Sequence, residues 1–418
     1  MEQLHKRLSD EQVKLVLRNY CEGSLSRLEA QETLGIGKSH FFVILKSYRA
    51  DPKGFSVNYE RSTPSKIGPE TEQAIRRELQ AEKKLVQDER LPISSYNYSA
   101  LRDRLQKKGM RVSVPTIIQR AKQQDCYRAR PRHKAHDRQV VTSAIGALVQ
   151  HDASTHLWSP YASEKWTLIT SIDDFSRKLL YADFVRQETS WAHIQAAQSL
   201  MQAYGSPLKY YVDNLRVFRF VQGRDSLWRK HVLMTDEVDP QWRQVMRLMG
   251  VQVTYALSPQ AKGKIERPYR WLQDRIVRTC ALEHLSSFEE VHAVLREEVD
   301  RYNNHQVHST TGEIPALRFE HARIAGNSFF RPFSIPKPYS SPKDVFCLRE
   351  TRMVNGYRKI SLFNHEIEMP HVPVREQVEL HLIPNLPQNV IEIRFWFQQK
   401  MVHSLALPLD QNLSTFQL

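Results

Sequence analysis

One short segment constrains this chain more than any other, because it joins a loop of small and basic residues to a helix. Residues 258–271 read Ser-Pro-Gln-Ala-Lys-Gly-Lys-Ile-Glu-Arg-Pro-Tyr-Arg-Trp. Pro268 fits the first turn of an α-helix, so we expect the helix to begin close to Glu266. Apolar residues at 265, 269, 272 and 276 then lie on one face. The segment predicts a carboxylate in the first turn of a half-buried helix.

Two aspartates lie at the ends of predicted strands upstream of this segment. Asp152 follows Val-Gln-His, and Asp213 follows Tyr-Tyr-Val. Runs typical of strands at 166–172 and 179–185 flank a turn at 173–177, and an amphipathic helix is predicted over 190–204. Strands come first, and strands and helices then alternate. This order predicts a mixed α/β sheet covered by helices.

Asp152, Asp213 and Glu266 are the candidate catalytic residues and metal ligands. The chain has 46 Asp and Glu, so three spaced acids also arise by chance, and their surroundings must decide. Mg²⁺ and Mn²⁺ prefer hard oxygen ligands, which three carboxylates supply. Two such ions about 3.5–4 Å apart would activate the attacking oxygen and stabilise the leaving oxygen of a phosphodiester. The trio therefore indicates chemistry on nucleic acid with two metal ions per site.

Charge is concentrated in the first third of the chain. Residues 1–138 hold 28 Lys and Arg against 17 Asp and Glu, which is +11 of the total +14. Such a basic region is typical of nucleic-acid binding, although basic proteins are common. A length of 418 residues predicts two to four domains.

The basic third reads as two helical modules and a linker. Residues 1–55 predict three helices with a turn at Gly35-Ile36-Gly37, and residues 65–126 predict three more. A helix, a glycine-bearing turn and a basic helix form the helix-turn-helix pattern. A plain helical bundle is the alternative for each module. Residues 127–144 form a basic linker, which either tracks a phosphate backbone or is a solvated tether.

Candidate DNA contacts fall in three places along the chain. They are Lys38, Ser39, His40 and Lys46 in the first module, Arg128, Arg130 and Arg132 in the linker, and Gln260, Lys262 and Lys264 before Glu266. By contrast, we expect His151 and His156 to pack locally, Asp173 and Asp174 to shape a turn, and Tyr269 and Trp271 to lie in a core.

The last part of the chain changes character again. Prolines at 332, 336, 338 and 342 mark a linker, and short alternating segments over 345–410 predict a small all-β barrel or sandwich. The four cysteines are scattered without Cys-x-x-Cys spacing, so no zinc finger is predicted and a reducing compartment is indicated. No apolar run approaches the roughly 20 residues of a membrane helix. We expect a soluble, intracellular protein with no membrane partner.

Several segments together resemble one family. Residues 258–266 are similar to the S-P-Q-x-x-G-x-x-E segment of retroviral integrases and related bacterial transposases. Residues 172–177 resemble their D-D-x-S-R turn, and Asp213-Asn214 resembles the start of their second motif. Residues 302–316 resemble the Y-N…H-S…G-x-x-P segment that closes many insertion-sequence transposase cores. The chain thus resembles a bacterial insertion-sequence DDE transposase of the retroviral integrase superfamily, closely over about 145–320.

The resemblance implies an RNase H-like catalytic core over 145–323, with Asp152, Asp213 and Glu266 as the metal ligands. It also implies a polynucleotidyl transferase that acts in the bacterial cytoplasm, at the nucleoid, on transposon terminal inverted repeats and target DNA. At least a dimer would assemble on DNA, and the need for a helper ATPase stays open. The chain departs from the family at Leu215, where glycine is usual, and in the long interval between Asp213 and Glu266.

Two other functions stay open at this stage. One is a catalytically silent DNA-binding regulator derived from a transposase, which would use only residues 1–138. The other is an RNase H-like nuclease without a transfer step. Retention of Asp152, Asp213 and Glu266 argues against the regulator, and the flanking modules favour recognition of specific ends over a plain nuclease.

Overall fold

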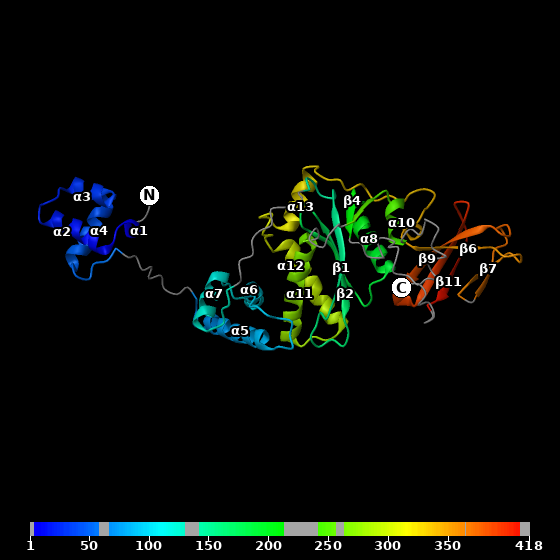
Figure 1. The fold of residues 1–418 in the computed structure, drawn as a ribbon, viewed down its shortest axis with the longest axis horizontal. Helices are drawn as coiled ribbons and strands as arrows, with labels where there is room; N and C mark the ends of the chain where they lie inside the picture. Colours follow the sequence, from blue (N-terminus) through cyan, green and yellow to red (C-terminus); the bar gives the residue numbers. More distant parts are fainter. Residues whose placement is uncertain are drawn as a thin grey trace, which may run out of the picture. The chain divides into compact units, whose positions relative to one another are not determined.

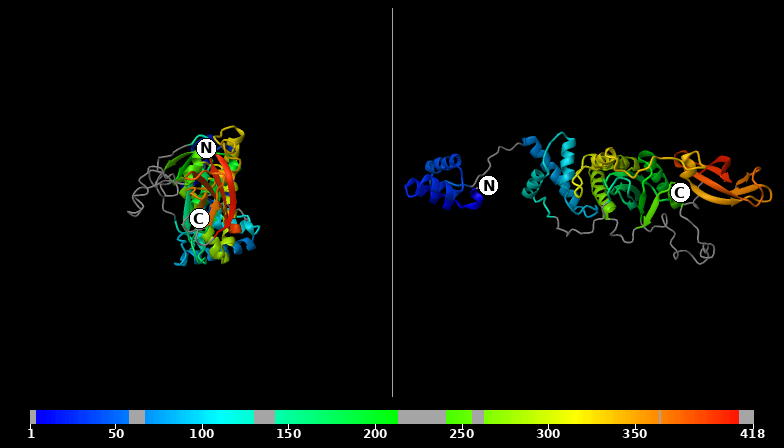
Figure 2. Two further views of the ribbon diagram at one scale, coloured as in Figure 1. Left: turned by 90° about the vertical axis from the view of Figure 1, so that its right-hand side faces the viewer. Right: turned by 90° about the horizontal axis from the view of Figure 1, so that it is seen from above.

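The computed structural model describes residues 4–57, 67–129, 142–212, 241–255, 263–363 and 365–409. The chain divides into two compact units, Met1–Ala74 and Ile75–Leu418. Figures 1 and 2 show the helices and strands of both units. Each unit is built around its own buried residues, so each is described separately.

The first unit is a small helical bundle. It contains α1 (Leu4–Arg7), α2 (Asp10–Cys21), α3 (Arg27–Leu34) and α4 (Lys38–Ala50). Ser9 and Ser26 begin α2 and α3 with reciprocal capping boxes, which satisfy amide groups that the first turn leaves free. Gly35 ends α3 in the left-handed region at φ 61°. Apolar residues of all four helices form one core, including Val13, Leu17, Leu34, Phe41 and Leu45.

Three more helices open the described part of the second unit. They are α5 (Pro69–Gln87, which starts before the unit boundary), α6 (Tyr98–Lys107) and α7 (Val114–Gln123). Ser113 caps α7, and Pro115 lies in its first turn, as the sequence predicts. Buried charges join α6 to the helices of the next layer. Arg275 donates to Asp103 at 2.7 Å, and all but 4% of its surface is buried.

A five-stranded mixed sheet forms the centre of the second unit. Its strands are β1 (Val149–His156), β2 (Trp166–Asp173), β3 (Leu179–Val185), β4 (Lys209–Val212) and β5 (Gln252–Tyr255), in the order β3-β2-β1-β4-β5. β2 pairs antiparallel with β1 and with β3, whereas β4 is parallel to β1 and β5. Every residue of β2 is buried, so both faces of this strand are covered. The predicted α/β sheet is confirmed.

Helices cover both faces of the sheet. One face packs on α8 (Ser190–Tyr204), with α10 (Gln241–Leu248) beside it, and the other on α11 (Gly263–Glu283) and α12 (Phe288–Asn304). α13 (Pro315–Ile324) follows α12 and packs against it. Figure 1 shows α11 and α12 on the opposite side of β1 and β2 from α8 and α10. The two faces thus have separate hydrophobic cores.

Strands continue in the last part of the unit. After the short helix α14 (Pro342–Val345), an antiparallel sheet has the order β11-β10-β9-β6. A separate hairpin joins β7 (Lys359–Leu362) to β8 (His365–Glu368). The four strands of the sheet are β6 (Leu348–Met353), β9 (Gln377–Asn385), β10 (Val390–Phe397) and β11 (Lys400–Pro408), with the 3₁₀ turn η2 (Leu386–Gln388) between β9 and β10.

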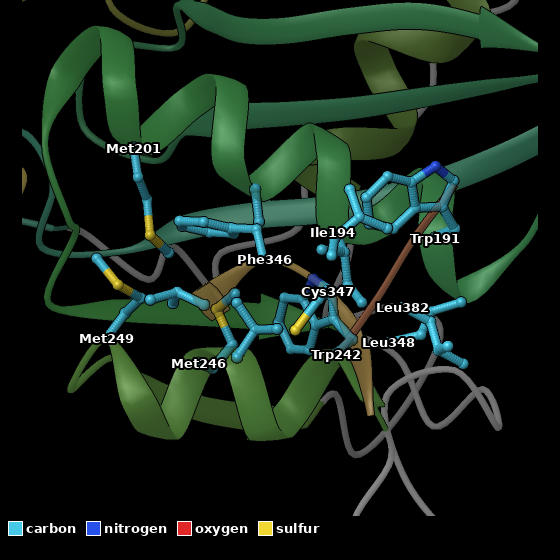
Figure 3. Packing of buried hydrophobic residues seen from close by; sticks show 14 of the residues in the cluster. Trp191, Ile194, Met201, Trp242, Met246, Met249, Phe346, Cys347, Leu348 and Leu382 are labelled. Atoms are coloured by element: carbon cyan, nitrogen blue, oxygen red, sulfur yellow. The ribbon is translucent and has the colours of Figure 1, made fainter. Parts of the chain in front are cut away.

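One hydrophobic cluster is shared by the two sheets. It contains Trp191 and Ile194 of α8, Trp242 of α10, and Phe346 and Leu382 from the carboxyl-terminal part. Figure 3 shows these side chains packed together. The side chain of Gln241 also bonds to the backbone of Arg349 in both directions, at 2.8 and 2.6 Å. Residues 345–409 are therefore bound to the α/β sheet by a continuous core.

The proline-bearing segment before α14 also lies against the sheet unit. The backbone of Ser206 and Arg331 exchange two hydrogen bonds of 2.9 Å. Gly205 has φ 95°, and a Cβ there would lie 2.3 Å from the Arg331 carbonyl oxygen. Only glycine permits so close an approach at that φ. Phe333, Ile335 and Tyr339 of the same segment pack against the shared hydrophobic cluster. The segment that the sequence marks as a linker therefore lies against the sheet unit.

Candidate active site

Asp152 lies in the middle of β1, on the face of the sheet that α11 covers. It is paired with Thr170 of β2 and is half-buried. Residues directly opposite in an antiparallel pair point to the same face, so Asp152 and Thr170 share a side. Leu168 and Ile172 lie two positions before and after Thr170, on the same face of β2, and pack with residues of α11 and α12. The alternation of the strand thus directs Asp152 toward α11.

The second candidate carboxylate, Asp213, lies outside the described residues. β4 ends at Val212, the residue before it. Parallel pairing of β4 with β1 matches Gln150 with Tyr211, so the described end of β4 lies next to His151 and Asp152. The end of β4, which directly precedes Asp213 in the sequence, therefore lies beside the part of β1 that carries Asp152.

Glu266 belongs to the first turn of α11, although its side chain is outside the described part of the structure. Tyr269 follows three residues later, which places it on the same side of the helix. Its hydroxyl accepts a hydrogen bond from Oγ1 of Thr170 at 2.8 Å and donates to the carbonyl of Leu168 at 3.4 Å. Burial raises the pKa of Tyr269 well above its usual value, and the negative charge of Asp152 raises it further. The start of α11 is thus held over the face that carries Asp152.

The start of α11 differs from the sequence prediction. The helix begins at Gly263, so Pro268 lies in its second turn rather than its first. Proline has no amide hydrogen, so the carbonyl of Lys264 receives no bond from it within the helix. The stripe formed by Tyr269, Leu272 and Ile276 is buried against β2, and this packing outweighs one missing bond.

A divalent cation fits the donors that the sequence supplies here. Among the described residues, no three His, Cys, Asp or Glu side chains are grouped to hold a metal ion. Asp213 and the side chain of Glu266 are outside that search. The candidate set contains carboxylate oxygens and no sulfur or nitrogen donor, which is the chemistry that Mg²⁺ and Mn²⁺ prefer. Asp152 would supply the described part of that set.

A chain of polar side chains lies behind Asp152, on the α8 face of the sheet. His151 contacts Ser171 at 2.8 Å and His193 at 2.9 Å, and His193 contacts Glu188 at 3.1 Å. Both histidines are fully buried. The expectation that His151 packs locally is confirmed. His156 is half-buried, and burial lowers its pKa. The contact of His193 with His151 could not be predicted from the sequence, because His193 lies among the buried apolar residues of α8.

Asp173 and Asp174, at the end of β2, hold the turn that follows through hydrogen bonds, as the sequence predicts. Asp173 accepts hydrogen bonds from the backbone and hydroxyl of Ser176, at 2.8 and 2.6 Å. Asp174 accepts from Thr142 and Gln150, at 2.8 and 2.6 Å. Both carboxylates are buried at the end of β2 away from the middle of the strand. Burial raises the pKa of Asp173.

The candidate DNA contacts are placed by the structure only in part. Lys38, Ser39, His40 and Lys46 are exposed on α4, and Arg128 is exposed after α7. Arg130, Arg132, Gln260 and Lys262 fall outside the described residues. Lys264 lies in the first turn of α11, and its side chain is not described. Within the described helices, none is long and apolar enough to span a membrane.

Two curated proteins are similar to this chain. "Putative transposase y4bF" of Sinorhizobium fredii is 26% identical over 279 residues, which is 65% of this chain and 56% of the relative. "Transposase for insertion sequence IS1202" of Streptococcus pneumoniae is 28% identical over 170 residues, which is 41% of this chain and 35% of the relative. The resemblance to insertion-sequence transposases is confirmed. The matches span about half and about a third of the relatives' lengths, and no family model matches the chain.

Solved structures of retroviral integrases are similar at low scores. The HTLV-2 integrase catalytic core domain with magnesium matches at 15% identity and a TM-score of 0.31, over 41% of this chain and 95% of that one. The simian T-cell lymphotropic virus intasome with a PP2A regulatory subunit matches at 13% and 0.35, over 74% and 92%.

Proposed function

We propose that this chain is a DNA transposase that binds transposon ends and catalyses metal-dependent cleavage and strand transfer into target DNA. Asp152, Asp213 and Glu266 are its proposed catalytic carboxylates, on an RNase H-like core. The observation that carries the proposal is the Tyr269–Thr170 hydrogen bond. It fixes the first turns of α11, where Glu266 lies, over the strand pair that carries Asp152.

The proposed chemistry needs placed carboxylates more than covalent help from the protein. Two Mg²⁺ or Mn²⁺ ions, when bound, would activate the attacking oxygen and stabilise the leaving oxygen. Asp152 is held in a fully paired strand, so its side chain has a fixed origin. Glu266 is carried by a helix whose next turn is anchored through Tyr269. Such rigid placement limits the reorganisation needed when substrate binds.

We propose that the two amino-terminal helical modules recognise the DNA ends. Residues 1–55 and 65–126 are proposed as helix-turn-helix domains, with 127–144 as a linker, 145–323 as the catalytic core and 345–410 as a β domain. α4 follows the Gly35–Gly37 turn and carries no acidic residue in its first turn. Its exposed Lys38, Ser39, His40 and Lys46 would contact bases and phosphates in the major groove.

One experiment tests the catalytic proposal. The full chain is incubated with Mg²⁺ and labelled DNA carrying the element's ends, and nicked and joined products are measured. Asp152→Asn, Asp213→Asn and Glu266→Gln should each abolish both products while end binding persists, because each removes a negative ligand and little volume. Asp183→Asn is the matched control, since Asp183 lies on β3 of the same sheet and pairs with His292. Normal joining by any of the three variants would refute the assignment.

The same assay separates the alternatives. A regulator would bind end DNA without cutting it, and a nuclease would cut without joining. Paired joining also needs two active sites at a fixed separation, so we propose at least a dimer on end DNA. Light scattering of the protein with end DNA measures this mass. A complex of one protein and one end that still joins paired ends would exclude the dimer.

A further inference from the structure

Three segments far apart in the sequence meet around His308. They are the turn after β2, the start of α11, and the loop between α12 and α13. Arg177 comes from the first, Arg267 from the second, and Arg318 from the start of α13, next to the loop. We call Arg177, Arg267 and Arg318 the arginine cluster. All three charges act on His308.

Local contacts fix each member of the arginine cluster. Arg177 has φ 67° and donates to Asp174 at 3.2 Å. Arg318 stacks on the ring of Phe175 at 4.2 Å and pairs with Glu313 at 2.5 Å. Two of the three positive charges thus have a carboxylate partner.

Arg267 differs from the other two. It is exposed and donates to the hydroxyl of Thr310 at 3.0 Å. Within the described ranges no carboxylate pairs with it. Because Arg267 directly follows Glu266, its positive charge lies at the edge of the candidate active site.

His308 adds a directed hydrogen-bond donor to the arginine cluster. The amide of Thr310 donates to Nδ1 of His308 at 3.3 Å, so Nδ1 carries no proton. Burial, followed by the three arginine charges, lowers the pKa of His308 to about 4. In the neutral ring the proton therefore lies on Nε2. No described residue accepts a hydrogen bond from Nε2.

Two buried polar atoms next to His308 also lack partners. Nε of Arg177 and the hydroxyl of Tyr302 make no hydrogen bond with any described residue. Arg177 is 7% exposed and Tyr302 5% exposed, and the Tyr302 and His308 rings lie 6.5 Å apart. Buried polar groups are nearly always satisfied, and an unmade bond here costs stability. Among the described residues, Nε of Arg177 and Nε2 of His308 are thus N–H donors without an acceptor, and the Tyr302 hydroxyl can also donate.

We propose that the arginine cluster and His308 bind a phosphodiester group of the DNA backbone beside the scissile position. An oxyanion supplies several acceptors at once, and arginine matches phosphate geometry with two parallel donors. The exposed Arg267 and Nε2 of the half-buried His308 provide the contacts, while Arg177 and Arg318 add positive potential. The site rests on the proposed function for its DNA ligand, but it requires no catalysis.

The test measures binding of the full chain to a random-sequence duplex at increasing salt, without divalent cation. Each phosphate contact contributes about 0.9 to the slope of log affinity against log salt. Arg267→Gln should lower the slope by about that amount. His308→Ala should weaken binding several-fold, and His308→Gln should retain most of it, because the Gln amide can donate from a position similar to Nε2. Arg323→Gln is the matched control, an exposed arginine on α13 paired with Glu320. It should bind as the unaltered chain does.

A second measurement identifies the ligand and guards against misfolding. The ¹³C-labelled histidine spectrum, with the His308 signal assigned through His308→Gln, should shift on adding duplex but not on adding equimolar inorganic phosphate. A shift with free phosphate alone would make the site one for a small anion and overturn the DNA assignment. An unchanged slope in Arg267→Gln, with His308 unperturbed by DNA, would overturn the site while the carboxylate assay still decides the proposed function. Failure of the unaltered chain to bind any DNA would overturn both.

Discussion

Oγ1 of Thr170 donates to the hydroxyl of Tyr269 at 2.8 Å, across 99 positions of sequence. Thr170 is the register partner of Asp152, and Tyr269 lies one helical turn beyond Glu266. A single bond between two residues that are not themselves acids therefore relates the positions of two candidate catalytic carboxylates. Tyr269 is buried in the core between α11 and the sheet.

We predict that Tyr269→Phe and Thr170→Val each destabilise the fold by about 1 kcal/mol, since each removes the buried Thr170–Tyr269 hydrogen bond, and Tyr269→Phe also removes the longer bond to the Leu168 carbonyl. Because they remove the same bond, the double variant should cost less than the sum of the two. Joining activity should fall further than end binding. Tyr302→Phe is the control, because its buried hydroxyl has no partner to lose. Additive losses in chemical denaturation would show that the bond does not couple the two elements.

The second prediction concerns the attachment of α6 to the catalytic helices. Arg275 is buried between Asp103 of α6 and Glu298 of α12. Arg275→Met leaves the buried Asp103 and Glu298 without their shared partner, and of the described residues only Arg102 and the more distant Arg301 still pair with them. Removing one partner of a buried ion pair typically costs about 3–5 kcal/mol. Arg275→Met should therefore lower the free energy of unfolding by that order and expose α5–α7 to protease.

Lys107→Met supplies the matched control for that pair. Lys107 joins the same two helices through Glu297, but both side chains are more than half exposed. Exposed pairs contribute about 0–1 kcal/mol. Similar losses from the two substitutions, measured by urea denaturation, would contradict a special role for burial.

Periodicity predicted most of this architecture, because it reports which side of an element is buried. The β2 run is rich in large apolar and β-branched residues, and the strand is buried throughout. The α11 stripe likewise predicted which side of the helix packs, although the helix begins before Glu266. The sequence predicts Asp152 at the end of a strand, but β1 continues to His156, so Asp152 lies in the middle of the strand.

Contacts between distant segments could not be predicted in that way. The buried pairs of Arg275 and the cluster at His308 depend on tertiary packing, which no local period encodes. The β10–β11 turn was also hidden, since Gln398 and Gln399 both take positive φ without the Asn-Gly pair typical of such turns. Asp213 and the Glu266 side chain lie outside the described structure, so the trio itself stays a prediction.

The third prediction concerns the core shared by the two sheets (Figure 3). Phe346 is fully buried among residues of α8 and α10. Phe346→Ala should cost about 3–5 kcal/mol, from lost burial and the cavity that remains. Phe329→Ala, at a residue 47% exposed, should change stability by less than about 0.5 kcal/mol. Thermal unfolding tests whether residues 345–409 unfold together with the α/β sheet, and we expect one transition for both. Two separate transitions, with only one shifted by Phe346→Ala, would show that they do not.

The last prediction is a pH dependence from His308. Its pKa falls from 6.5 to about 4 on folding, so the unfolded chain binds more protons between those values. The stability from the neutral ring is fully present above pH 6.5 and is lost as the pH falls toward 4. Arg177, Arg267 and Arg318 face the ring and disfavour its protonation, while Asp174 and Glu313 pair with two of them. The stability advantage of the unaltered chain over His308→Gln should therefore shrink from pH 7 to pH 4 in urea titrations. Removing one arginine charge by Arg267→Gln should reduce this pH sensitivity. Parallel stability curves for the unaltered chain and His308→Gln would show that His308 does not titrate between pH 7 and pH 4.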